Sequence, residues 1–217
     1  MPTKPDPRFL SITAHDLRGA VGVIDGAMKE LVREVGKDNA DAPKLTQMMN
    51  RSTQRLLLLG DRLSSLAKLM DGAELELTDN VDLTALVKEA AQRAFAAHAR
   101  RNLRLQIIDG TETSAPVHAQ SFAAAVGELT ALFCSFSQAE LKVSVAPEAN
   151  GVRIKFESDN AGESVQRALR DRQSTTQANA GINFAEAVLN RHHGTLELSE
   201  NDGSNAALSL VLSRSNA

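Results

Sequence analysis

The chain is poor in the residues that build disulfides, thiolate metal sites and stacking surfaces. It has one cysteine, Cys134, no tryptophan, no tyrosine and seven phenylalanines in 217 residues. A single cysteine excludes an intramolecular disulfide and a cysteine-based zinc site, and it fits a reducing cytoplasm. The few aromatic side chains leave little surface on which single-stranded bases could stack. We therefore expect a cytoplasmic protein without a nucleic-acid partner.

Charge of one sign and long hydrophobic runs are also lacking. The formal net charge is -3, which gives no electrostatic reason to expect nucleic acid or an anionic membrane as partner. The longest apolar stretch, residues 122–136, is too short to span a bilayer and contains Glu128. With 42% hydrophobic residues the chain can still bury substantial cores. We expect one or two domains and no membrane partner.

A heptad pattern of apolar residues lies near the amino terminus of the chain. Apolar residues alternate four and three apart at Leu10, Ala14, Leu17, Val21, Ile24, Met28, Leu31 and Val35. This spacing predicts a long helix with a coiled-coil seam. Asp6 and Pro7 suit its start, because an aspartate caps the helix and a proline needs no N–H there. Gly36 suits its end, so we predict a helix over residues 7–35.

A second heptad follows a polar turn at residues 37–43. Its seam positions are Leu45, Met49, Ser52, Leu56, Leu59, Leu63, Leu66 and Met70. Two long helices joined by a short turn fold into an antiparallel hairpin. One hairpin cannot hide both apolar stripes, so a second copy is expected to complete a four-helix bundle. The sequence thus predicts a homodimer.

His15 lies one step off the first seam, with Asp16 beside it and Arg18 about one turn further along. A residue off the seam should be exposed at the edge of the bundle. Arg18 is expected on the same side of the helix as His15. An ordinary surface histidine is the alternative that the pattern alone leaves open.

Three glycines follow His15 inside the first predicted helix, at Gly19, Gly22 and Gly26. Each costs up to about 1 kcal/mol relative to alanine in a helix interior. They would be tolerated if another helix packed closely there, or if the bare surface admitted the backbone of a partner. The sequence leaves both explanations open.

The pattern changes after a predicted linker at residues 71–80. Asp82 can cap a helix over residues 83–101. Alternating apolar residues predict strands at 103–108, 141–145, 152–156, 195–198 and 207–212. Apolar helices are predicted at 122–136 and 182–191, with a shorter one at 164–172. These elements predict a sheet of about five strands with helices on one face.

This order of parts resembles the cytoplasmic core of a sensor histidine kinase. Residues 9–18 resemble the H-box of that family, residues 81–83 the start of its ATPase domain, and residues 190–198 with Gly203 and Ser204 its carboxyl-terminal end. The resemblance implies an α+β protein. Residues 1–72 would form a dimerisation and phosphotransfer hairpin, in a dimeric four-helix bundle. Residues 73–217 would form an α/β sandwich of the gyrase/Hsp90 ATPase type.

The resemblance makes His15 the phosphoacceptor and Asp16 its acidic neighbour. Asp16 could then orient the imidazole or hold its proton, and Arg18 could steady a phosphoryl group. The ATP site departs from the family. The family carries a magnesium-binding Asn on the first long ATPase helix, followed by a basic residue, and residues 122–136 have neither. The Asp-x-Gly-x-Gly motif reads DNAGE, which keeps Asp159 and Gly162 only in a vestigial form. The last glycine motif, NAGI, keeps Gly181, and residues 163–178 are short for an ATP lid. Losing the magnesium ligand outweighs keeping Asp159.

Two further departures lie beside His15. Family members that also act as phosphatases commonly carry Thr or Asn where this chain has Gly19, and Ala20 stands where a Pro often kinks the helix. The other histidines, His98, His118, His192 and His193, lack an accompanying set of acids or thiols, so no metal site is expected. Cys134 is expected in the core.

Three functions follow as expectations. The first is a histidine phosphotransferase that resembles dimeric relay proteins built on a decayed kinase fold. His15 would pass phosphate between the aspartates of response regulator receiver domains, without ATP and with magnesium supplied by the receiver. The second is a divergent autophosphorylating kinase. The third is a non-catalytic module that binds a response regulator.

Overall fold

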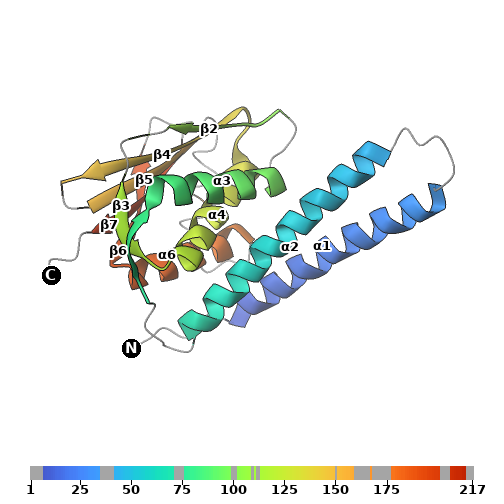
Figure 1. Ribbon diagram of the computed structural model, residues 1–217, viewed down its shortest axis with the longest axis horizontal. Helices are drawn as coiled ribbons and strands as arrows, with labels where there is room; N and C mark the ends of the chain where they lie inside the picture. The colour runs from blue at the N-terminus through green and yellow to red at the C-terminus, as the bar shows by residue number, and fades with distance from the viewer. Residues whose placement is uncertain are drawn as a thin grey trace.

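The computed structural model describes residues 7–34, 42–70, 76–98, 102–108, 110, 113–149, 151–158, 167, 177–200 and 206–213. A long helical hairpin lies against a compact domain of helices and strands, and the far end of the hairpin projects beyond that domain (Figure 1). The expected α+β fold class, a hairpin followed by an α/β sandwich, is therefore confirmed.

The hairpin consists of α1, Pro7–Glu34, and α2, Ala42–Met70. Both helices match the predicted ranges closely, but residues 37–43 are not wholly a turn. Ala42 and Pro43 already belong to α2, because proline fits the first turn of a helix, where its missing N–H has no partner to lose. The predicted cap Asp6 and the predicted stop Gly36 lie outside the described residues.

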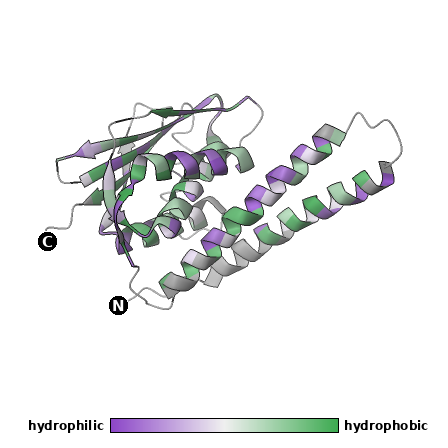
Figure 2. Cartoon of the chain, in the orientation of Figure 1, coloured by the Kyte–Doolittle hydropathy of each residue, from purple (hydrophilic) through white to green (hydrophobic). Residues whose placement is uncertain are grey.

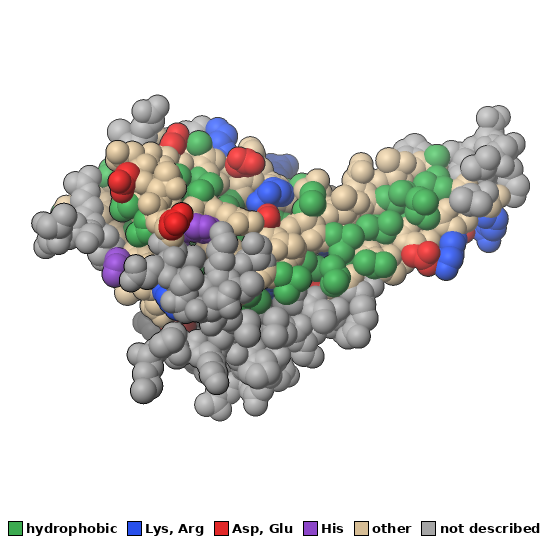
Figure 3. Space-filling model, turned by 60° about the horizontal axis from the view of Figure 1, so that its bottom comes forward, with side chains coloured by type: hydrophobic (Ala, Val, Ile, Leu, Met, Phe, Trp, Pro, Cys, Tyr) green, Lys and Arg blue, Asp and Glu red, His purple; other side chains and the backbone are tan. Residues whose placement is uncertain are grey.

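The seam of α1 is only partly covered within one chain. Ala20 and Ala27, one heptad apart, are buried, whereas the seam residues Leu17, Val21 and Met28 are 39%, 50% and 49% exposed. Hydrophobic side chains gather along the projecting hairpin in Figure 3, and Figure 2 marks hydrophobic residues on both of its helices. The hairpin therefore carries an apolar stripe that its own two helices do not bury.

The α/β domain contains the five strands that the sequence predicts. They are β2, Arg104–Ile108; β4, Glu140–Glu148; β5, Gly151–Ser158; β6, Gly194–Glu200; and β7, Ala206–Ser213. The sheet order is β2-β4-β5-β7-β6, with β2 parallel to β4 and the other pairs antiparallel. Alternate residues of β5, including Ile154 and Phe156, are buried, as expected for a sheet covered on one face.

Three helices lie between this sheet and the hairpin (Figure 1). They are α3, Leu83–His98; α4, Ala119–Phe136; and α6, Gln177–Arg191. Asp82 caps α3 as predicted, since its Oδ1 accepts a hydrogen bond from the Ala85 N–H at 3.0 Å. The predicted helix at 164–172 falls almost entirely outside the described residues.

A second, two-stranded sheet was not predicted. It pairs β1, Thr78–Asp82, antiparallel with β3, Ser114–Val117. The predicted linker at 71–80 is therefore wrong at its end, where β1 begins. The register shifts between Thr78 and Val81, and Asn80 has a φ of 57°. This irregularity hides the alternation by which a strand is recognised in a sequence.

Helix α4 forms the centre of the domain. It spans 18 residues and, alone among the described helices, is long and apolar enough to cross a membrane by length and composition. Phe122, Leu129 and Phe133 are nevertheless fully buried inside the domain, in a core that α4 shares with α3, α6 and the sheet. The apolar character of α4 is thus accounted for by its place in the core.

Candidate functional site

The helix that carries His15 is well formed, and its backbone is helical on both sides of that residue. The side chains of His15 and Arg18 lie outside the described part of the chain, so their predicted roles stay predictions. Around them, Leu17 and Gly19 are exposed and Asp16 is half-buried. The described neighbours of His15 thus lie at the surface of the hairpin or at its edge.

The glycines of α1 lie on one stripe with His15, at spacings of four, three and four residues. A methyl group added at Gly19, Gly22 or Gly26 would meet nothing within 4 Å. Close packing within one chain is therefore not what these glycines serve. Of the two explanations that the sequence leaves open, the bare surface is the one this structure favours.

Asp16 belongs to a buried charge cluster at the junction of three helices. Arg62 of α2 is only 2% exposed, and its Nη1 lies 3.9 Å from Asp16 Oδ2 of α1. Its Nε lies 3.3 Å from Glu128 Oε1 of α4. Arg62 thus sits between the acid next to His15 and an acid of the α/β domain. We call Asp16, Arg62 and Glu128 the junction cluster.

The electrostatics of the junction cluster are asymmetric. Burial raises the pKa of Glu128, the Arg62 guanidinium opposes that rise, and the Asp16 carboxylate adds to it. The effect of burial outweighs that of the guanidinium in a place that largely excludes water. As the pH falls, Glu128 therefore takes up a proton more readily than an ordinary glutamate.

Gly181, which the resemblance in sequence places in the last glycine motif, lies against the same cluster. A Cβ at this position would approach Glu128 Oε2 to 2.8 Å. A glycine here therefore lets α6 pass close to a buried carboxylate. A carboxylate at this place repels phosphate groups, and α4 carries no Asn, Lys or Arg to hold magnesium or phosphate. The other vestigial positions, Asp159 and Gly162, lie outside the described residues.

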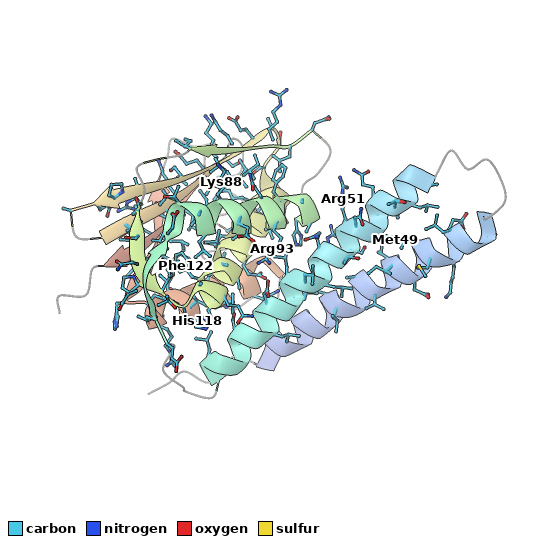
Figure 4. The ribbon with its side chains drawn as sticks, viewed as in Figure 1. Met49, Arg51, Lys88, Arg93, His118 and Phe122 are labelled. Carbon is cyan, nitrogen blue, oxygen red and sulfur yellow. The ribbon has the colours of Figure 1, made fainter. Side chains whose placement is uncertain are left out.

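Further polar contacts join the hairpin to the α/β domain. Arg93 of α3 pairs with Asp61 of α2 at 3.0 Å, and Figure 4 shows Arg93 between the two helices. Arg55 Nε donates to the Ala97 carbonyl at 2.9 Å, at the end of α3. The junction cluster is one part of a continuous contact along α2.

Apolar residues complete this contact. A methyl group added at Gly127 of α4 would lie 3.7 Å from Leu58 of α2, so the two helices are closely packed there. Leu66 and Leu69 near the end of α2 are buried in the same cluster as the core residues of the α/β domain. If the hairpin were a separate domain, α2 would bury its apolar residues within the hairpin. Instead, the end of α2 contributes to the core of the α/β domain.

Two histidines of the α/β domain serve its structure. The Nε2 atom of the buried His192 accepts a hydrogen bond from the backbone N–H of His118 at 3.0 Å. The ring proton of His192 is therefore on Nδ1, which faces the Val188 carbonyl at 2.8 Å. His118 in turn caps α4 by accepting from the Ser121 N–H. Figure 4 shows His118 and Phe122 at the start of α4. These contacts account for both rings without a metal.

No group of three or more His, Cys, Asp or Glu side chains among the described residues could hold a metal ion. Cys134 is buried in α4, and burial raises the pKa of its thiol to about 12, so it is a core residue as expected. Sequence reasoning missed Arg62 and gave Glu128 no role. The signal was present, because an acid inside an apolar helix needs a buried partner.

Comparisons with known proteins identify the fold. No family model matches the chain, and no curated protein sequence matches it. Among solved structures, the Acinetobacter baumannii histidine kinase AdeS superposes with a TM-score of 0.56 at 19% identity, over 93% of this chain and 98% of that one. A structure described as a bacterial phosphotransferase superposes with a TM-score of 0.58 at 10% identity, over 97% of this chain and 99% of that one.

The α/β domain also has a counterpart of its own. The ATP binding domain of PrrB from Mycobacterium tuberculosis superposes with a TM-score of 0.50 at 18% identity, over 64% of this chain and 97% of that domain. The chain therefore has the fold of a sensor histidine kinase core, a helical hairpin followed by a domain of the histidine-kinase ATPase type.

Proposed function

We propose that the protein is a cytoplasmic histidine phosphotransferase in a two-component phosphorelay, and that His15 carries the phosphate. It takes the phosphoryl group from the aspartate of one receiver domain and passes it to the aspartate of another. Response regulator receiver domains are its partners. No ATP takes part, and the receiver supplies the magnesium in its own acidic pocket.

The chemistry asks little of the hairpin beyond an exposed neutral imidazole. A ring nitrogen of His15 attacks the phosphorus of the aspartyl phosphate, the bond from phosphorus to the acyl oxygen breaks, and the carboxylate leaves as an anion. The other ring nitrogen then releases its proton. Asp16 orients the ring or holds that proton, and Arg18 steadies the phosphoryl oxygens. The second transfer is the same step in reverse.

The observation that carries this proposal is the position of Glu128. Its carboxylate lies 2.8 Å from the Cβ position of Gly181, where the resemblance would put the last phosphate-binding glycine. Its partner Arg62 comes from the hairpin. Together with the missing Asn on α4, this supports a domain that does not use Mg-ATP, beside a hairpin that keeps the His15 and Asp16 positions of the H-box.

We also propose that the working form is a homodimer through the hairpins. Leu17, Val21 and Met28 of the seam are exposed in one chain, and a second hairpin would bury them in a four-helix bundle. The open glycine stripe beyond His15 would then lie on the outside of that bundle, where the backbone of a receiver could approach.

The first prediction compares two phosphate donors. The purified chain should gain no label from radiolabelled Mg-ATP, and it should gain label from receiver domains of the same genome that have been charged with labelled phosphate. His15→Ala should abolish acceptance and leave the dimer mass unchanged, because a residue off the seam contributes little to packing. Asp16→Ala should do less harm, since an aspartyl phosphate needs less base assistance than ATP.

The other outcomes separate the alternatives. Labelling of His15 from Mg-ATP, together with calorimetric binding in the micromolar range, would establish a divergent autokinase, the function named for the AdeS structure. Tight binding of a receiver without any transfer would establish the non-catalytic binding module. Normal acceptance by the His15→Ala variant would refute the proposed role of His15.

A further inference from the structure

The junction cluster links the residue next to His15 to the α/β domain through a single buried cation. Its three members come from α1, α2 and α4, and Arg62 lies 3.9 Å from Asp16 and 3.3 Å from Glu128. Asp16 and Glu128 are 18% and 17% exposed, against 2% for Arg62. A charge that is removed from water in this way interacts strongly with its neighbours and is little screened by salt.

We propose that Arg62 is a positioning residue through which Glu128 of the α/β domain sets the effective charge of Asp16, and thereby the readiness of His15 to accept phosphate. The proposal rests on the phosphotransferase function proposed above. It gives the α/β domain a regulatory role toward His15 that needs no nucleotide.

The physical argument is a competition for one cation. When Glu128 is charged, its carboxylate competes with that of Asp16 for the Arg62 cation. Arg62 then offsets less of the negative field of Asp16. When Glu128 loses its charge or moves away, Arg62 offsets Asp16 more completely. Asp16 is the next residue to His15, so its field stabilises the protonated imidazole, and any change in that field changes the pKa of His15.

The other charged groups along this contact are engaged differently. Asp61 pairs with Arg93 of α3, and Arg55 donates to a carbonyl at the end of the same helix. His98 is close enough to Arg55 and Arg62 for both to lower its pKa. Among these residues, Arg62 has an acid of α1 on one side and an acid of α4 on the other.

The test measures labelling of the full chain by potassium phosphoramidate, a small phosphoryl donor that needs no docking partner. The imidazole attacks phosphorus, the P–N bond breaks and ammonia leaves. Because only the neutral ring attacks, the pH midpoint of the rate reports the pKa of His15. The variants are Glu128→Gln, which keeps the side-chain shape without the charge, and Arg62→Met, which removes the cation.

The two variants should move the midpoint in opposite directions. Glu128→Gln removes the acid that competes with Asp16 for Arg62, so the midpoint should shift by about half a unit to lower pH. Arg62→Met removes the cation that lies between Asp16 and Glu128, so the midpoint should shift to higher pH. Glu157→Gln is the matched control. It makes the same change in the same domain, on β5, where Glu157 pairs with Lys155 and not with the hairpin, and its midpoint should equal that of the wild type.

A role of Arg62 in folding alone would lower labelling at every pH and leave the midpoint fixed, which overturns the proposal. If Arg62→Met does not fold, Asp16→Asn decides, because the shift caused by Glu128→Gln must vanish in the Asp16→Asn background. A shift that persists there refutes coupling through Arg62. A wild-type chain that accepts phosphate neither from phosphoramidate nor from any receiver refutes the proposed function as well.

Discussion

His98 shows how a single residue at the contact between hairpin and domain responds to pH. Burial lowers its pKa from the ordinary value of 6.5 to about 4, and the nearby cations of Arg55 and Arg62 contribute to that shift. His192 has a lowered pKa for the same first reason, burial. Both rings are therefore neutral in the folded chain at a pH where an unfolded chain would protonate them.

The consequence is a loss of stability in mild acid. An unfolded chain binds more protons than the folded one below the unfolded pKa of 6.5, so the free energy of unfolding falls as the pH drops from there toward 4. For His98 the loss between about pH 7 and about pH 5 should be about 2 kcal/mol. Urea denaturation at both pH values measures it.

A matched pair of variants isolates this effect. His98→Gln should remove the contribution of His98, about 2 kcal/mol, and leave that of His192, whereas His193→Gln, at an exposed histidine, should keep the full loss. Equal acid sensitivity of His98→Gln and the wild type would show that the ring is not kept neutral by its surroundings.

Among the helices, α4 packs closely against both α2 and α3 because it has a glycine, Gly127, where the three helices meet. A Cβ at Gly127 would lie 3.7 Å from Leu58 of α2 and 3.8 Å from Ala94 of α3. These are ordinary contact distances, so a methyl group fits and a longer side chain does not. The glycine is thus a limit on size and not a requirement of the backbone.

Two substitutions at Gly127 should therefore have opposite effects on the free energy of unfolding. Gly127→Ala should be neutral or stabilise the protein by up to about 1 kcal/mol, because alanine favours the helix. Gly127→Leu should cost about 1–3 kcal/mol through overpacking against α2 and α3. Thermal unfolding of both variants measures this. A Gly127→Leu variant as stable as the wild type would mean that α2 is not held against α4.

The helices and strands differ in how well they can be predicted from the sequence. The heptads of α1 and α2 and the alternation in the five long strands predict those elements because their burial follows a fixed period. Strands β1 and β3 were missed because they are short, because β1 is interrupted at Asn80 and because β3 contains Pro116. Their pairing comes from tertiary contact between distant segments, which no local pattern records.

The candidate site divides in the same way. The motif around His15 was recognised from the sequence, because its residues are adjacent along the chain. Arg62 and Glu128 are far apart in the sequence and belong to different helices, so their meeting follows only from the docking of α2 on α4. Arg62 in the sequence is simply one polar residue between Leu59 and Leu66 of a seam.

At the scale of the whole molecule, the exposed seam of α1 predicts assembly. Val21→Glu places a charge on the seam at a residue that is 50% exposed in one chain, so it should leave the fold of the chain intact and prevent association. Light scattering should give the mass of a dimer for the wild type and of a monomer for this variant. Val23→Glu, also on α1 but off the seam, is the control and should remain dimeric.

A monomeric mass of the wild type in dilute solution would contradict this prediction. So would an unchanged mass of Val21→Glu, which would place the interface elsewhere on the chain.

The burial of Leu66 and Leu69 in the core of the α/β domain also bears on whether the hairpin could be separated from that domain. A chain shortened to the hairpin would expose both leucines of α2 and would remove Glu128 from beside Arg62. The hairpin alone should therefore be less stable than it is in the full chain, because part of its hydrophobic core belongs to the other domain.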